Sequence, residues 1–362
     1  MSFSDQLAGA LTGVPRRTNA LSAFADSPKL VATTDRLAMV RSVAPATPAT
    51  GPAAAPATTP VLQLEPLPVT LNPADYANAV SNANPGGSYA TLAAFQQLTN
   101  PVPTFSRYYS PSPASTEDVY GNIVNGADVP GGSAFTEQVI AGAQKLFAQY
   151  VLANMGGVPG TWHPVYASPA DWYDVKQMSR FTPLSIDLTS GSPAVAGFTT
   201  LPGTDSDDLA WVMGNPGQTT TQPLHPGTQL QKVSFQALRV DLSRPWLSFE
   251  IFQTKGWRLA GQNAGIVSSG VTAQNNGMMP LIATGLIVGL NVSLTANWSA
   301  ADQAVLRMLP TTVERISLGP FVLFGGLKFP RPVMVNANTV QASVLQVIAW
   351  ISELVPFSPF TS

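Results

Sequence analysis

Cysteine is absent from the sequence, and several other absences narrow its chemistry further. Without thiols the protein has no disulfide, no zinc–thiolate site and no cysteine nucleophile. Its core must therefore hold together by packing and hydrogen bonding alone. A chain of 362 residues is long enough for this, because a domain of such a size buries roughly three quarters of its unfolded surface.

Charged side chains are scarce as well. They make up 10% of the residues, whereas soluble domains usually have about 25%, and the net charge is only −2. Electrostatic repulsion between copies is therefore weak. Much of the outer surface must be neutral, or be covered by neighbouring subunits. We favour an assembled protein, and a neutral polar coat on an extracellular protein is the alternative.

Long apolar runs and export signals are missing too. The most apolar stretch, Met278 to Leu290, is shorter than the ~20 residues that a membrane helix needs, so it predicts a pair of buried strands and no transmembrane segment. The N-terminal residues include Asp5, where a signal peptide carries Lys or Arg. We therefore expect synthesis in the cytoplasm without conventional export, with a virion or an extracellular particle as possible destinations.

No motif names a reaction. The nucleophile elbow, the phosphate-binding loop and the dinucleotide-binding glycine pattern are all absent. The two histidines, His163 and His225, each precede a proline, which favours an extended loop. They are interpreted as structural, with a metal pair or a general base as alternatives. Asp171 and Asp174 resemble a carboxylate pair beside aromatics, but helix capping explains Asp171. We predict no catalytic activity and no cofactor.

One acidic cluster is a weak candidate for metal binding. Asp205, Asp207 and Asp208 alternate in a glycine-containing loop and carry the oxygen ligands that Ca²⁺ prefers. The glycine and the later glutamate of a calcium loop are missing. A helix that begins at Ser206 or Asp207 explains the acidic residues equally well.

The N-terminal part differs from the rest. Residues 1–43 form an arm in which Phe3, Leu7 and Leu11 recur at helical spacing, which predicts a short amphipathic helix. We expect this helix to dock on a neighbouring subunit. The arm is mildly basic, so it contributes at most a weak contact with nucleic acid. Residues 44–60 are rich in Pro, Ala and Thr, which favours an extended spacer, or alternatively an unused tether.

Residues 61–362 form the body, a β-rich α+β fold with a sandwich or jelly-roll-like arrangement and long loops at 100–132 and 189–229. Helical insertions are predicted near 73–98, 134–155, 169–179 and 300–308. Strands are predicted at Val233–Leu242, Leu247–Phe252, Leu281–Val292, Val313–Leu318 and Val344–Leu354.

Basic and aromatic residues combine in two short segments, Arg244-Pro245-Trp246 and Lys255-Gly256-Trp257-Arg258. Arginine stacks on tryptophan and anchors protein interfaces, so we predict that Arg244, Trp246, Lys255, Trp257 and Arg258 contribute to an interface. Two other interpretations stay open. In one, the tryptophans plug the core while the arginine stems cover them, and in the other the cluster binds a ligand by stacking.

These observations favour a structural subunit of a large homo-oligomeric complex, such as a capsid, sheath or filament. Its expected partners are copies of itself, with other shell or filament proteins as further candidates. A secreted or injected binding module that contacts glycans or membranes is the first alternative. An enzyme with an unrecognised site is the second.

Overall fold

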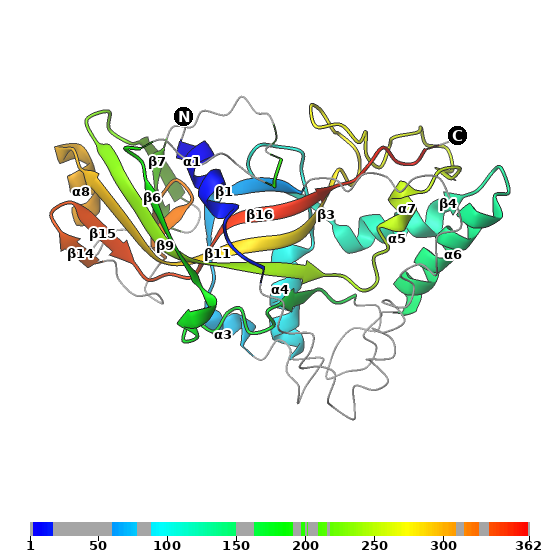
Figure 1. The fold of residues 1–362 in the computed structure, drawn as a ribbon, viewed down its shortest axis with the longest axis horizontal. Coiled ribbons are helices and arrows are strands. Elements are labelled where there is room, and N and C mark those ends of the chain that lie inside the picture. Colours follow the sequence, from blue (N-terminus) through cyan, green and yellow to red (C-terminus); the bar gives the residue numbers. More distant parts are fainter. Residues whose placement is uncertain are drawn as a thin grey trace.

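The computed structural model describes residues 3–16, 60–77, 88–149, 163–190, 197–199, 201, 209–215, 218–308, 315–325 and 333–360. The predicted spacer, apart from Pro60, and the acidic cluster at Asp205, Asp207 and Asp208 lie outside these residues. Strands dominate the described part and form several antiparallel sheets, which confirms a β-rich α+β fold. Figure 1 shows an elongated molecule, with sheets toward one end and a group of helices toward the other.

One large antiparallel sheet forms the centre of the molecule. Its middle strand, β11 (Leu281–Asn297), pairs with β9 (Gln229–Ser243) on one edge. Its other edge pairs first with β16 (Gln346–Leu354) and then with β15 (Thr339–Ala342). Four strands extend the sheet outward, namely β1 (Val61–Thr70) on β16, β5 (Tyr166–Ser168) and β6 (Thr182–Asp187) on β9, and β14 (Val333–Asn336) on β15.

The central strand is buried on both faces, which explains its continuous apolar sequence. Leu286 and Val288 point into one hydrophobic cluster, and Ile287 between them points into another. The apolar stretch at 278–290 therefore contributes a single central strand rather than the predicted strand pair. Residues 281–290 are enclosed in this way, whereas Met278, which precedes the strand, is exposed.

A second, four-stranded sheet covers one face of the large sheet. Its order is β13 (Phe321–Phe324), β12 (Arg315–Leu318), β7 (Ala210–Asn215) and β8 (Gln218–Pro223). Gln346 joins the two sheets from a fully buried position. Its amide accepts from the Val322 N–H at 2.6 Å and donates to the Val322 carbonyl at 3.2 Å. Helix α1 (Phe3–Leu11) packs into the same cluster.

Helix α8 (Ala300–Met308) begins as its sequence predicts, with Ser299 accepting from the Asp302 N–H. Asp302 is fully buried, although capping residues usually face solvent. Its carboxylate accepts from the Trp211 indole N–H at 2.8 Å and from the Thr228 hydroxyl. Asp302 therefore has two roles. Its N–H completes the cap of α8, and its carboxylate ties the helix to Trp211 of the four-stranded sheet.

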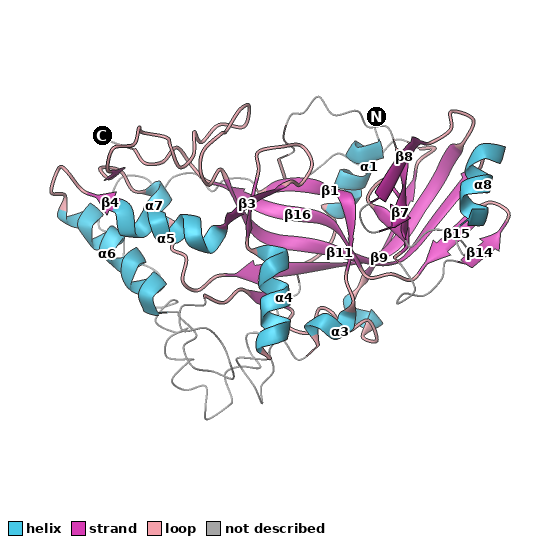
Figure 2. Ribbon diagram, turned by 180° about the vertical axis from the view of Figure 1, so that it is seen from behind, coloured by secondary structure: helices cyan, strands magenta, loops and turns pink. Residues whose placement is uncertain are grey.

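The other face of the large sheet is covered by α3 (Pro73–Tyr76) and α4 (Tyr89–Thr99). Figure 2 shows both helices beneath the strands. Asn72 caps α3 by accepting from the Ala74 N–H, as its sequence predicts. Trp172 is buried between Tyr76 and Phe95, at ring distances of 4.9 and 5.7 Å.

A third cluster forms the helical end of the molecule. Its elements are α5 (Thr116–Gly126), α6 (Ala134–Gln149), α7 (Glu250–Gln253) and the short strand pairs β2 (Pro101–Pro103) with β3 (Pro111–Ser115) and β4 (Ala127–Asp128) with β10 (Arg258–Leu259). Trp246 and Trp257 are fully buried there. The predicted helix at 134–155 contains α6, and residues 150–155 lie outside the described part.

Residues 169–179 differ from the helix that the sequence predicts. They form turns, followed by the 3₁₀ turn Met178–Arg180. The Asp174 carboxylate accepts from the Lys176 N–H at 3.0 Å and from the Gln177 side chain at 3.1 Å. Such side-chain hydrogen bonds offer the backbone an alternative to the helix. Asp171 pairs with Arg180 instead of capping a helix.

Residues 247–252 were expected to form a strand, but residues 250–252 belong to the single helical turn α7. The Trp257 indole N–H donates to the carbonyls of Ile251 and Thr254, both at 3.0 Å, and thereby satisfies the end of this turn. The contact comes from a residue beyond the turn, so the local apolar pattern could not reveal it.

The two expected long loops also contain regular structure. Residues 100–132 include β2, β3, α5 and β4, and residues 189–229 include β7 and β8. Ser115 caps α5 by accepting from the Asp118 N–H at 3.0 Å. The strand β7 begins at Ala210 and replaces the helix that was considered as an explanation of the preceding acidic residues.

Candidate functional site

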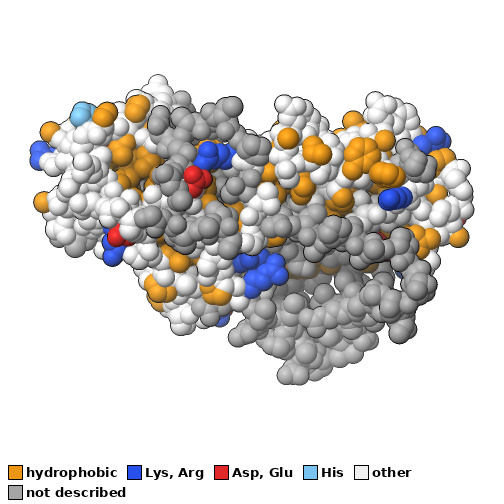
Figure 3. Space-filling view, turned by 45° about the horizontal axis from the view of Figure 1, so that its top comes forward, with side chains coloured by type: hydrophobic (Ala, Val, Ile, Leu, Met, Phe, Trp, Pro, Cys, Tyr) orange, Lys and Arg blue, Asp and Glu red, His pale blue; other side chains and the backbone are white. Residues whose placement is uncertain are grey.

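Exposed apolar side chains gather at the helical end. Six large apolar residues of the described part are exposed, and all but Met178 lie around the loop 265–278 and the C-terminal segment 355–360 or at the start of α6. These five residues, which we call the aromatic end, are Phe135, Val271, Met278, Phe357 and Phe360. Figure 3 shows orange side chains close to blue ones at this end of the molecule. Contiguous exposed apolar surface marks contact sites in soluble proteins.

The C-terminal segment holds two of these rings in place. Phe357 and Phe360 meet edge to face at 5.8 Å. The Lys255 ammonium lies 4.6 Å from the Phe360 ring centre, a cation–π contact. The Gly256 N–H donates to the Phe360 carbonyl at 2.8 Å, and the Thr136 hydroxyl donates to the Lys255 carbonyl at 2.9 Å. These bonds connect the segment to the start of α6, next to Phe135.

The loop beside the segment is held equally closely. Gly270 has a φ of +67°, and an added Cβ would lie 2.3 Å from the Phe357 backbone nitrogen, so only glycine fits there. Ser268 is buried, donates to the Val355 carbonyl and accepts from the Asn275 side-chain amide at 2.8 Å. The exposed phenylalanines therefore stand on a hydrogen-bonded frame.

Three of the five predicted interface residues of the tryptophan–basic cluster lie inside this chain's own core. Trp246 and Trp257 are fully buried, and the Trp246 indole donates to the Pro164 carbonyl at 2.7 Å. Arg244 is buried and donates to the carbonyls of Thr99 and Ala283, both at 2.5 Å. Burial lowers the pKa of Arg244 to about 10. The interface expectation must therefore be corrected for these three side chains, because they plug the chain's own core.

The remaining two residues lie at the helical end. Lys255 borders Phe360, as described above. Arg258 is half exposed and pairs with Asp128 at 3.0 Å across the β10–β4 strand pair. Within the tryptophan–basic cluster, the candidate interface is thus narrowed to Lys255 and Arg258. The exposed residues of the aromatic end, which the sequence did not single out, extend it. The sequence carried no signal that separates them from buried aromatic residues: Phe360 follows Pro359, but Trp246, which follows Pro245, is buried.

The predicted amphipathic helix is present as α1, and it packs on the body of its own chain. Leu7 and Leu11 are buried, and the Phe3 ring meets Phe321 at 6.1 Å. The apolar residues of α1 thus have a defined seat between the two sheets.

The histidines lie in different surroundings, and the structure does not bring them together. His163 is buried, with Nδ1 2.8 Å from Glu117 Oε1 and Nε2 2.8 Å from the Phe147 carbonyl oxygen. His225 is exposed, and its Nδ1 accepts from the Gly227 N–H at 3.0 Å. Both ring nitrogens of His163 are engaged within the chain, which matches the structural interpretation of that residue.

Within the described residues, no three His, Asp or Glu side chains are arranged to hold a metal ion. The calcium candidates Asp205, Asp207 and Asp208 are not among these residues. Asp171 and Asp174 are each engaged in the turn described above.

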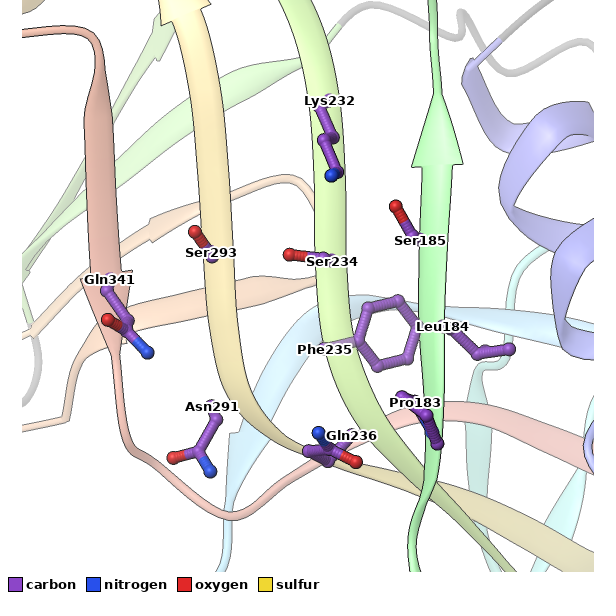
Figure 4. A pocket seen from close by; sticks show the side chains of 10 residues that line it. All are labelled: Pro183, Leu184, Ser185, Lys232, Ser234, Phe235, Gln236, Asn291, Ser293 and Gln341. Carbon is purple, nitrogen blue, oxygen red and sulfur yellow. The ribbon is translucent and has the colours of Figure 1, made fainter.

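A polar hollow of about 450 Å³ lies on the large sheet, away from the aromatic end. Ser185, Ser234, Ser293 and Gln341 are direct neighbours across β6, β9, β11 and β15. Figure 4 shows this row with Asn291, Gln236 and Lys232 around it. Lys232 is the one charged residue of the lining, and the Phe235 ring is buried. The hollow offers hydroxyl and amide groups for hydrogen bonds, without an exposed ring on which a sugar could stack.

The chain matches no protein-family model, no curated protein and no solved structure. Among the helices that the structure describes, none is both long and apolar enough to cross a membrane.

Proposed function

We propose that this protein is a structural subunit that assembles with copies of itself into a large complex of the capsid, sheath or filament kind. The aromatic end is the observation that carries the proposal. Five exposed apolar side chains on a hydrogen-bonded frame would lose their contact with water on association. Full burial of an exposed phenylalanine contributes on the order of 2 kcal/mol, and each of these rings, 37–64% exposed, would gain the corresponding part of it.

The charge distribution supports the same function. Net charge is −2, and charged residues are 10% of the chain, so long-range repulsion between copies is weak. Lys255 borders Phe360, Arg258 lies at the same end of the molecule, and both carry long apolar stems. A sandwich or jelly-roll-like body, with two packed sheets, is the architecture that we propose for the subunit.

The binding-module alternative rests on the polar hollow and receives less support. Its neutral hydroxyl and amide groups suit a glycan, but its one aromatic ring, Phe235, is buried. Membrane contact through residues 281–290 is disfavoured, because this part of β11 lies inside the molecule, and Met278 is the one exposed residue of the segment 278–290.

Light scattering on the purified full chain at micromolar concentration tests the proposal, with negative-stain micrographs to show the form. We expect a large complex for the unmodified protein. The double variant Phe357→Ser/Phe360→Ser should give species of much lower mass. Met178→Ser removes an apolar side chain that is 37% exposed outside the aromatic end, and this matched control should assemble like the unmodified protein.

A monodisperse monomer for the unmodified protein would overturn the proposed function. Unchanged assembly by the double variant would show that the aromatic end does not carry it. Circular dichroism and a urea titration of each variant show whether the fold is retained. We expect it to be retained, since both mutated rings are more than one third exposed.

A further inference from the structure

Helix α1 occupies a seat that is apolar at its centre. Leu7 is fully buried and Leu11 is 1% exposed, and both belong to the cluster between the two sheets. The seat is formed by residues far away in the sequence, among them Phe321 and Ile186. A nine-residue helix is too short to be stable alone in water. Helix α1 therefore depends on its seat.

Polar contacts fix the position of the helix within the seat. Near its N-terminal end, Ser4 Oγ lies 3.0 Å from the Tyr108 hydroxyl, and Asp5 pairs with Arg107 at 3.5 Å. Beyond its C-terminal end, Arg16 lies 3.8 Å from the Asp241 carboxylate. Contacts of opposite charge at both ends give the seat a defined direction and register. The seat thus recognises this particular segment.

The connection between α1 and the body is far longer than docking on its own body requires. Helix α1 contacts β1, the strand that the connection leads into, yet residues 17–59 separate the two described segments. A flexible chain of that length has a root-mean-square span of roughly 35 Å. The seat of a neighbouring copy is within such a reach.

The composition of the connection favours a neighbour over the chain's own body. Residues 44–60 are rich in proline, which favours an extended spacer that would span roughly 50 Å at full extension. An extended spacer of this composition would carry the arm away from the start of β1. Docking on the same body would then require residues 17–43 to return over that distance, which docking on a neighbouring copy would not.

We propose that, in the assembled protein, α1 docks in the seat of a neighbouring copy and ties the copies together by arm exchange. This inference rests on the proposed assembly function. The contacts within the seat are the same whether the helix comes from the same chain or from another. Once the aromatic ends hold copies together, neighbouring seats are present at high effective concentration. Exchange of identical elements then costs little.

Cross-linking of engineered cysteines tests the exchange without background, because the chain has no cysteine. Asp5→Cys and Arg107→Cys place thiols on the two sides of an ion pair whose side chains are 51% and 22% exposed. Chains with only Asp5→Cys are co-assembled with chains that carry only Arg107→Cys. A short bis-maleimide reagent is then added. Arm exchange should give a covalent dimer on denaturing gels, with the two cysteine peptides linked in its mass spectrum.

The matched control mixes chains that carry only Asp5→Cys with chains that carry only Ser343→Cys. Ser343 is exposed in the connection between β15 and β16, and this mixture should give few dimers. The double variant Asp5→Cys/Arg107→Cys, diluted until it is monomeric, should cross-link within one chain, which shows that the seat is intact. In the assembled state the same variant should shift to links between chains.

Links only within one chain in the assembled double variant, together with no dimer from the mixed chains, would overturn arm exchange. Light scattering on the same samples separates the two proposals. Assembly without interchain links would leave the proposed function standing and remove only the exchange. A failure to assemble would remove both.

Discussion

The sheet region and the helical end shield their apolar residues to different degrees. In the sheet region, parts of β6 and β9 alternate between buried apolar side chains, such as Ile186 and Val233, and polar side chains that are at least partly exposed, and the Ser185–Ser234–Ser293 row is the result. At the helical end, five large apolar side chains of the described residues remain exposed. The sheet surface is already satisfied by water, whereas the helical end gains free energy only when another surface covers it.

Arg244 follows β9 and joins the end of α4 to β11 beneath the large sheet, and its removal should give the largest effect. Arg244→Ala leaves the carbonyls of Thr99 and Ala283 without this donor and opens a cavity. We expect a loss of about 3 kcal/mol in the free energy of unfolding, measured by urea titration. The matched control Arg258→Ala breaks only a half-exposed ion pair and should cost less than about 1 kcal/mol. Equal losses in the two variants would contradict the joining role.

The two sheets within the sheet region should depend on Gln346. Gln346→Leu leaves the Val322 N–H and carbonyl unpaired in a buried position. A loss of about 2–3 kcal/mol is expected in the same titration. Gln341→Leu makes the same chemical change on the partly exposed polar face and should stay within about 0.5 kcal/mol. A destabilisation by Gln341→Leu as large as that by Gln346→Leu would mean that the polar face is not simply water-facing.

The covered face of the large sheet should show a smaller, pH-dependent effect through Tyr76. Burial, followed by the Asp75 carboxylate, raises the pKa of Tyr76 from 10.0 to about 12. The protonated phenol therefore stabilises the fold fully below pH 10, and this contribution is lost as the pH rises toward 12. Between pH 10 and pH 12, the free energy of unfolding of Tyr76→Phe should fall by about 1–2 kcal/mol less than that of the unmodified protein. Parallel urea midpoints across this range would argue against the burial of this ring.

Some local features could be predicted because their causes are local. Asn72 and Ser299 cap α3 and α8 through side chains that lie within three residues of the N–H groups they bind. The amphipathic pattern of Phe3, Leu7 and Leu11 likewise predicts α1. The absence of cysteine and the low charge follow directly from composition. The strands β9, β11 and β16 were recognisable from their β-branched and apolar residues.

Other features depend on side-chain hydrogen bonds that residue periodicity does not reveal, some of them between residues distant in the sequence. The turn at 250–253 is completed by Trp257, and the turns at 169–177 are completed by Asp174 and Gln177. Arg244 and Trp246 resembled interface residues because their types are common there. Their burial depends on carbonyls of Thr99, Pro164 and Ala283, which the sequence does not place nearby.

The sequence by itself determined that this protein has a strand-rich body, weak charge repulsion, no thiol chemistry and a separate amphipathic arm. Composition and short-range periodicity are enough for these properties, since each depends on residue types or on neighbours within one or two turns of chain. Only the tertiary structure decided which aromatic residues are buried and which are exposed. Trp246 and Phe360 are both aromatic residues close to a proline, but the packing of distant segments encloses one and leaves the other 37% exposed.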